Sequence, residues 1–219
     1  MSAFTQVFPT SGSSQARSGS FGTAWAAPSN VTTGNSTDAT MDHSGAGNSA
    51  NVYTEWLSGS FPALTLPAGA ELVGFEAKVS ARKTGGPGGK NAFVDRLETG
   101  GGVLLGSGSA DLTSSYQTFT YGSPTSLSGV TLADLSSGSF SLRVSLKNSS
   151  SFSGIGTLST GVDSLSYIAY YSLRLRGTVR AAEVGGQFPA RPVRVWDGSS
   201  WKAKAVKYWN GASWVKVGS

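Results

Sequence analysis

The sequence contains no cysteine, and only one of its 219 residues is a histidine. Without thiols, disulfide bonds, thiol chemistry and cysteine-ligated metal sites are excluded. Charged residues make up 13% of the chain, about half of the usual share. No apolar run approaches the roughly 20 residues of a membrane span, and residues 1–9 lack the charged and apolar regions of a signal peptide. We therefore expect a soluble protein made in a cytoplasm, with no cofactor, bound metal or membrane partner.

Small residues are abundant instead, with 30 glycines and many serines and threonines. Three segments alternate apolar and polar residues with a period of two, at 73–82, 140–147 and 165–176. Such alternation is what an antiparallel sheet covering a core requires. Weaker strands are expected at 52–57, 92–97, 103–105 and 116–121. The best helical candidate is a single turn at 131–137. This pattern predicts an all-β fold, an antiparallel jelly-roll-like β-sandwich.

The composition divides the chain into four parts. Residues 1–20 are polar, small and nearly unpatterned, which indicates an N-terminal arm that is disordered or ordered only by a neighbour. The β-sandwich domain is expected at 21–182. Residues 183–192 contain Gly185, Gly186 and Pro189 and are interpreted as a linker. Residues 193–219 form the tail.

The tail contains a tandem repeat, VRVWDGSSW at 193–201 and VKYWNGASW at 206–214. Each unit places Asp-Gly or Asn-Gly between β-favouring residues, which is a strong hairpin signal because a type I′ turn needs two residues with positive φ. Cross-strand partners share a face of the sheet. Trp201 and Trp209 are an even number of residues apart, so a continuous strand joining the two units would place both on the same face. We therefore predict a small three-stranded β-meander with one aromatic face, formed by Trp196, Trp201, Trp209 and Trp214.

Residues 191–219 carry the whole net charge of +5, because residues 1–190 contain equal numbers of acidic and basic side chains. Four tryptophans represent roughly 600 to 1,000 Å² of apolar surface, more than a soluble monomer usually exposes. We expect the tail to pack against its own domain, a second copy or another protein. The residues predicted to bind a partner or a glycan are the four tryptophans with Tyr208, Arg194 and Lys207. A basic aromatic surface can also bind nucleic acid, but cations that keep an exposed sheet soluble are the simpler interpretation.

Catalytic motifs are weak. His43 is the only histidine available as the base of a Ser-His-acid triad, and no nucleophile-elbow sequence lies near it. Asp38 and Asp42 could supply oxygen ligands to a hard cation, although a solvated loop is favoured. The carboxylates available for a glycosidase pair, which must face each other across a cleft about 5 to 9.5 Å wide, are Glu76, Asp95, Glu98 and Asp111.

A glycine-rich run at 84–91 superficially matches a phosphate-binding loop. It departs from that motif because Thr84 replaces the first glycine and Asn91 replaces the Ser or Thr that binds Mg²⁺. It also lies between two expected strands. We interpret it as an inter-strand loop and expect the protein not to be an enzyme.

Three stretches resemble proteins of tailed bacteriophages. LPAGAELVGFEAKV at 66–79 resembles a segment of β-sandwich domains in phage virion proteins, and LADLSSGSF at 132–140 is similar to a later segment of the same domains. The tandem tail units look like the C-terminal repeats of minor tail proteins, especially of phages that infect actinobacteria. The resemblance implies a minor tail protein of the virion, made in the host cytoplasm and assembled with other virion proteins.

Two tail units are fewer than the roughly three that a stacked repeat array needs, which favours docking or homo-oligomerisation. Two alternatives remain open. One is a head-decoration or head-fibre protein of the same virion. The other is a carbohydrate-binding module, in which Trp56 or the tail tryptophans stack on host cell-wall glycan.

Overall fold

The computed structural model describes residues 2–18, 20, 24–43, 53–86, 92–148 and 157–173, and in the tail 193–196, 199–204, 207–209 and 214–216. The chain divides into two compact units, Met1–Arg176 and Gly177–Ser219. Each unit is described by itself.

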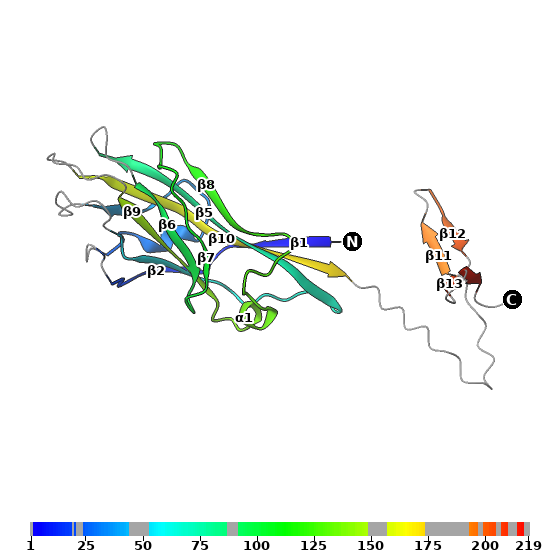
Figure 1. Cartoon of the computed structure of the whole chain (residues 1–219). Helices are drawn as coiled ribbons and strands as arrows, with labels where there is room; N and C mark the ends of the chain where they lie inside the picture. Colours follow the sequence, from blue (N-terminus) through cyan, green and yellow to red (C-terminus); the bar gives the residue numbers. More distant parts are fainter. Residues whose placement is uncertain are drawn as a thin grey trace. The chain divides into compact units, whose positions relative to one another are not determined.

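The first unit is a sandwich of two antiparallel sheets (Figure 1). The strands of sheet 1 are, in spatial order, β1 (Ser2–Val7), β10 (Ser159–Leu173), β5 (Ala70–Gly85) and β8 (Gln117–Ser123), with β3 (Ala39–Asp42) also paired to β10. The strands of sheet 2 are β2 (Ser11–Gln15), β4 (Trp56–Ser60), β9 (Ser141–Asn148), β6 (Ala92–Thr99) and β7 (Leu104–Gly106). The predicted all-β, antiparallel jelly-roll-like sandwich is confirmed.

The core lies between the sheets and is built by the three alternating segments, which form β5, β9 and β10. Their inward side chains are buried, among them Phe75 and Tyr167. These two rings pack with Phe61 and Phe140 into an aromatic cluster with ring centroids 5.0 to 6.0 Å apart. Burial raises the pKa of the Tyr167 phenol to about 12, because ionisation in an apolar core is unfavourable.

The N-terminal segment differs from the expected arm. Residues 2–7 form β1, which pairs with β10, and residues 11–15 form β2, which pairs with β4. The short connection between them contains the buried Pro9. These strands lack alternation because an edge strand is held largely by backbone hydrogen bonds to one neighbour. Gly12 also lets the 3-10 helix η1 (Pro28–Val31) approach closely, since a Cβ there would lie 1.9 Å from the Pro28 carbonyl oxygen.

The predicted helical turn is present as α1 (Leu132–Ser136). A capping box starts it: the Thr131 backbone N–H donates to Asp134 Oδ2 at 2.8 Å, and the Asp134 N–H donates to Thr131 Oγ1 at 3.2 Å. Leu135 anchors the turn in the core. No helix in the described part of the chain is long and apolar enough to cross a membrane.

The tail contains two hairpins rather than one meander. The first pairs β11 (Val193–Trp196) with β12 (Trp201–Lys204), and the second pairs β13 (Lys207–Trp209) with β14 (Trp214–Lys216). Among the described residues they form two separate two-stranded sheets. Within the described residues each strand pairs only with the other strand of its own repeat unit, so the predicted pairing across the two units is not present there. The expected linker at 183–192 lies outside the described residues.

Candidate functional site

The residues predicted to bind a partner all lie in the two tail hairpins. The register places Trp196 opposite Trp201 and Trp209 opposite Trp214, so each pair closes its hairpin next to the turn. Arg194, Tyr208 and Lys207 lie on the first strand of their hairpins, where Lys207 is opposite Lys216. The predicted common face of the four tryptophans concerns side chains outside the described part of the structure.

Trp56 lies at the centre of a charged and aromatic group on the outer face of sheet 2. Leu57 and Val144 are paired and point into the core, so the neighbouring Trp56 and Ser145 point outward. The guanidinium carbons of Arg17 and Arg143 lie 4.7 and 4.8 Å from the Trp56 ring centroids. Only 7% of Trp56 is exposed. The expectation that Trp56 offers an open platform to a sugar is therefore wrong, because cations cover the ring.

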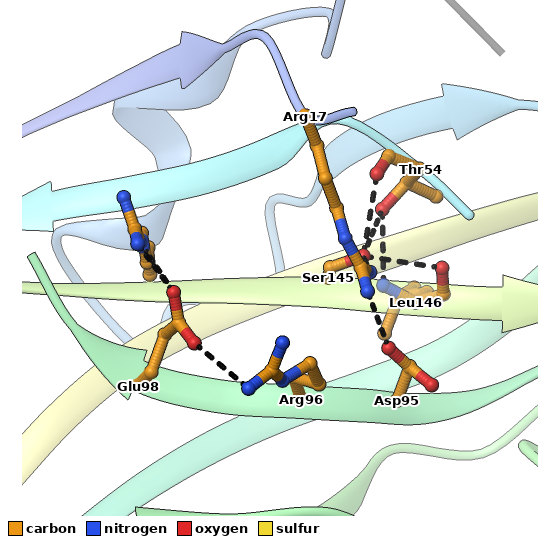
Figure 2. Close-up of polar contacts among 8 residues, drawn as sticks. Arg17, Thr54, Asp95, Arg96, Glu98, Ser145 and Leu146 are labelled. Carbon is orange, nitrogen blue, oxygen red and sulfur yellow. Dashed lines mark hydrogen bonds and ion pairs between the residues drawn. The ribbon is translucent and has the colours of Figure 1, made fainter. Parts of the chain in front are cut away.

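Arg17 connects the N-terminal segment to this face. Its guanidinium donates to Asp95 Oδ2 at 2.8 Å and to the Ser145 hydroxyl, and lies 4.1 Å from the centroid of the Tyr53 ring. Figure 2 shows the Arg17 side chain extending toward Ser145 and Asp95. The Ser145 hydroxyl also donates to the Thr54 carbonyl at 3.2 Å. The segment after β2 thus covers the outer face of sheet 2.

Glu98 on β6 completes the group, which we call the Trp56 cluster: Arg17, Trp56, Asp95, Glu98 and Arg143. Arg143 Nε donates to Glu98 Oε1 at 2.6 Å, and Arg96 Nη2 lies 3.6 Å from Glu98 Oε2 (Figure 2). The Glu98 side chain is 4% exposed. Such a carboxylate is held by cations and is closed to an external ligand.

The four acids considered for a glycosidase pair are placed separately. Asp95 and Glu98 are bound by arginines on sheet 2. Glu76 lies on β5 in sheet 1, where its Oε2 accepts a hydrogen bond from the Tyr170 hydroxyl at 2.8 Å. Asp111 is exposed in a loop. The fold does not bring Glu76 and the sheet 2 carboxylates across one cleft.

His43, Asp38 and Asp42 do not converge either. His43 is buried, and its Nε2 lies 3.0 Å from Thr160 Oγ1. Burial lowers the pKa of His43 to about 4, so its ring is neutral at pH 7. Asp42 accepts a hydrogen bond from the Ser159 hydroxyl at 2.6 Å, whereas Asp38 pairs with Arg82. The alternative in which Asp38 and Asp42 together bind a cation is therefore not supported, because the two carboxylates have different partners.

Asp38 belongs instead to a group on the outer face of sheet 1, which we call the Asp163 cluster: Asp38, Arg82, Tyr116 and Asp163. Arg82 Nε and Nη2 bind Asp38 Oδ2 at 2.8 and 2.7 Å, and its guanidinium carbon lies 4.3 Å from the Tyr116 ring centroid. Burial raises the pKa of the Asp163 carboxyl. Hydrogen bonds from the backbone N–H groups of Ser36 and Thr37 lower this pKa, but burial has the larger effect. The sequence feature that pointed to this group is Asp163, because aspartate is unusual inside a long β-strand.

Two surface recesses flank α1. One has a volume of about 370 Å³, and its polar lining includes Thr99, Asp134, Ser137, Ser139 and Ser141. The other, of about 580 Å³, is lined by residues 69–72, Leu127, Thr131 and Leu132. The stretches at 66–79 and 132–140 therefore meet in the fold. In the described part of the chain, no group of three or more His, Asp or Glu side chains is arranged to hold a metal ion.

Comparisons with known proteins add little. No protein-family model matches the chain, and no curated protein matches it. A solved structure described as "CBM4 structure and function" matches 52% of this chain and 70% of its own chain, at 10% sequence identity and a TM-score of 0.26. Because so little geometry is shared, this likeness carries no argument about function.

Proposed function

We propose that this chain is a non-enzymatic structural component of a tailed-bacteriophage virion, specifically a minor tail protein that contributes to tail assembly or host-surface attachment. Its partners are other virion proteins and further copies of itself. The observation that carries the proposal is the tandem pair of tryptophan hairpins, which follows a complete sandwich and repeats one sequence with one register.

The hairpins are too small to be independent domains. Each of their strands has three or four residues, and an isolated two-stranded hairpin is at best marginally stable in water. Packing against another surface would supply the missing stability. A hairpin pair of this kind is suited to attachment, which agrees with the resemblance of its repeats to those of minor tail proteins.

The sandwich gives independent support. Its two phage-like stretches lie 53 or more residues apart in the sequence yet line one recess beside α1. Residues 69–72 of the first stretch and Leu132 of the second are therefore close together in the fold. A head-decoration or head-fibre protein would use the same surfaces and remains the close variant of this proposal.

Purified virions test the proposal directly. We expect peptides of this chain in virions that have been separated from free protein, and density for a β-sandwich on the particle. Deleting residues 191–219 should leave the sandwich folded by circular dichroism but abolish oligomerisation or incorporation. Absence of the chain from purified particles would contradict the proposal, and a truncated chain that assembles normally would contradict the role of the tail.

Carbohydrate binding is the second candidate, favoured by the recess of about 370 Å³ and its hydroxyl and carboxylate lining. These groups can hydrogen-bond sugar hydroxyls. Pull-down with host cell-wall glycan would compare the wild type with Ser139→Leu, which narrows the recess, and with Trp214→Ala in the tail. Loss in only one variant assigns the glycan to that surface, and no binding by the wild type removes this candidate.

A further inference from the structure

Two buried carboxylate oxygen atoms of the Asp163 cluster, Asp38 Oδ1 and Asp163 Oδ1, have no hydrogen-bond partner among the described residues. The Tyr116 hydroxyl lies beside them and interacts with the Asp38 side chain. The three residues come from separate segments, with Asp38 before β3, Asp163 within β10 and Tyr116 before β8. A buried polar atom without a partner costs about 1 to 3 kcal/mol, so two unpartnered carboxylate oxygens in one cluster indicate an additional ligand.

The charges of the cluster are also unbalanced. Both nitrogens of Arg82 bind the same oxygen, Asp38 Oδ2, and leave Oδ1 of that carboxylate open. Asp163 is 7% exposed, and its charge interacts with both Asp38 and Arg82. Two carboxylates therefore share one guanidinium. A buried net negative charge is unfavourable unless a cation compensates it.

The backbone is shaped around these carboxylates. Asp163 occupies a bulge in β10 between Val162 and Ser164, and bulges redirect side chains. Gly161 lies directly under Asp38, because a Cβ at that position would be 2.6 Å from Asp38 Cγ. Ser36, whose N–H approaches Asp163, has a φ of 65°, a conformation that L-residues rarely adopt. Strain of this kind is typical of ligand sites.

We propose that the Asp163 cluster is a binding site for Ca²⁺, with Asp38 Oδ1 and Asp163 Oδ1 as carboxylate ligands and the Tyr116 hydroxyl beside them. Hard cations prefer oxygen ligands, and Ca²⁺ accepts six to eight of them in flexible geometry. Backbone carbonyls and water would complete the shell. Mg²⁺ fits less well because it demands near-ideal octahedral geometry. With two carboxylates, the expected Kd is on the order of 10⁻⁴ to 10⁻³ M.

Thermal unfolding of the full-length chain tests the site. At a Ca²⁺ concentration about ten times the Kd, the Tm should rise by about 3 to 5 °C relative to the protein in EDTA. Asp163→Asn should abolish this rise while remaining folded in EDTA. Asp42→Asn is the matched control, because Asp42 is exposed and bonded to Ser159 outside the cluster, and it should keep the full response.

Isothermal titration calorimetry with Ca²⁺ supplies the second measurement, with one ion expected per wild-type chain and none for Asp163→Asn. A wild-type Tm that does not change with Ca²⁺ would overturn the proposal, as would an unchanged response in Asp163→Asn. An equal or larger response to Mg²⁺ alone would overturn the assignment to Ca²⁺. The result is independent of the virion proposal, since the site can bind an ion in any assembly.

Discussion

An arginine, a carboxylate and an aromatic ring meet on the outer face of each sheet, but the two groups are satisfied to different degrees. In the Trp56 cluster, Asp95 and Glu98 are each bound by an arginine, and two guanidinium groups lie over the ring. In the Asp163 cluster, carboxylates outnumber the single guanidinium. The two clusters contain the same kinds of residue. They differ in whether each buried carboxylate has its own arginine, and this difference separates a closed structural network from an open site.

Removing the aromatic ring of each cluster should give the largest difference between them in the free energy of unfolding. Trp56→Ala should lower the free energy of unfolding by about 3 kcal/mol, because the ring is buried and two guanidinium groups pack on it. The matched change in the other cluster, Tyr116→Ala, should cost only about 1 kcal/mol, since that ring is partly exposed. Urea denaturation measures both. Equal losses would show that the clusters do not differ in packing.

Removing one carboxylate charge should have the next largest effect. Glu98→Gln leaves Arg143 without its anion and should cost about 2 to 3 kcal/mol, below the full value for a buried pair because Arg143 is 24% exposed. Asp163→Asn in EDTA makes the same chemical change where negative charge is in excess, and should not destabilise. Loss of stability in both variants to the same extent would contradict the proposed difference in charge balance.

The pH dependence of the free energy of unfolding, measured in EDTA, should differ by a smaller amount between the wild type and Asp163→Asn. The folded-state pKa of Asp163 is raised above its unfolded value of 3.8, so the folded chain binds this proton first and this group favours folding as the pH falls. The advantage of Asp163→Asn over the wild type should therefore shrink as the pH is lowered through the raised pKa. Asp38, Arg82 and Tyr116 face the same group. Paired urea titrations at several pH values measure this, and a difference that grows in acid would reverse the assignment.

Of these side chains, Arg96 should contribute least to the free energy of unfolding. Its side chain is 42% exposed and lies 3.6 Å from Glu98, and exposed ion pairs contribute about 0.2 to 1 kcal/mol. Arg96→Ala should therefore change stability by less than about 0.5 kcal/mol. Arg143→Ala, which removes the short bond to the same carboxylate, should cost clearly more in the same urea experiment. A large effect of Arg96→Ala would mean that Glu98 depends on both arginines.

The parts of the fold that could be predicted are those in which side chains alternate. The segments at 73–82, 140–147 and 165–176 match β5, β9 and β10, because their inward residues face one core. The sequence of β2, SGSSQ, carries no such signal. Its position follows from backbone pairing with β4 and from the close approach of η1, which are tertiary effects. The tail hairpins were predictable because their turn chemistry is local.

The two clusters could not be predicted, since their members are far apart in the sequence. Arg17 and Asp95 are 78 residues apart, and Arg82 and Asp38 are 44 apart. Asp38 and Asp42 are close in the chain, but Asp38 pairs with Arg82 on β5 whereas Asp42 accepts a hydrogen bond from Ser159 on β10, so proximity in the sequence does not identify their partners. The position of Asp163 depends on a β-bulge, and the two-residue alternation of a strand sequence does not reveal a bulge.

The pairing of β1 with β10 also constrains how the protein is made. Gln6 donates to Ser166 across 160 residues of sequence, so sheet 1 cannot be completed until β10 has emerged from the ribosome. At about 5 to 20 residues per second, the first strand waits roughly 8 to 30 s for its partner. Throughout translation of the sandwich, the nascent chain therefore holds β1 without its partner strand, and completion of the sandwich is a late event.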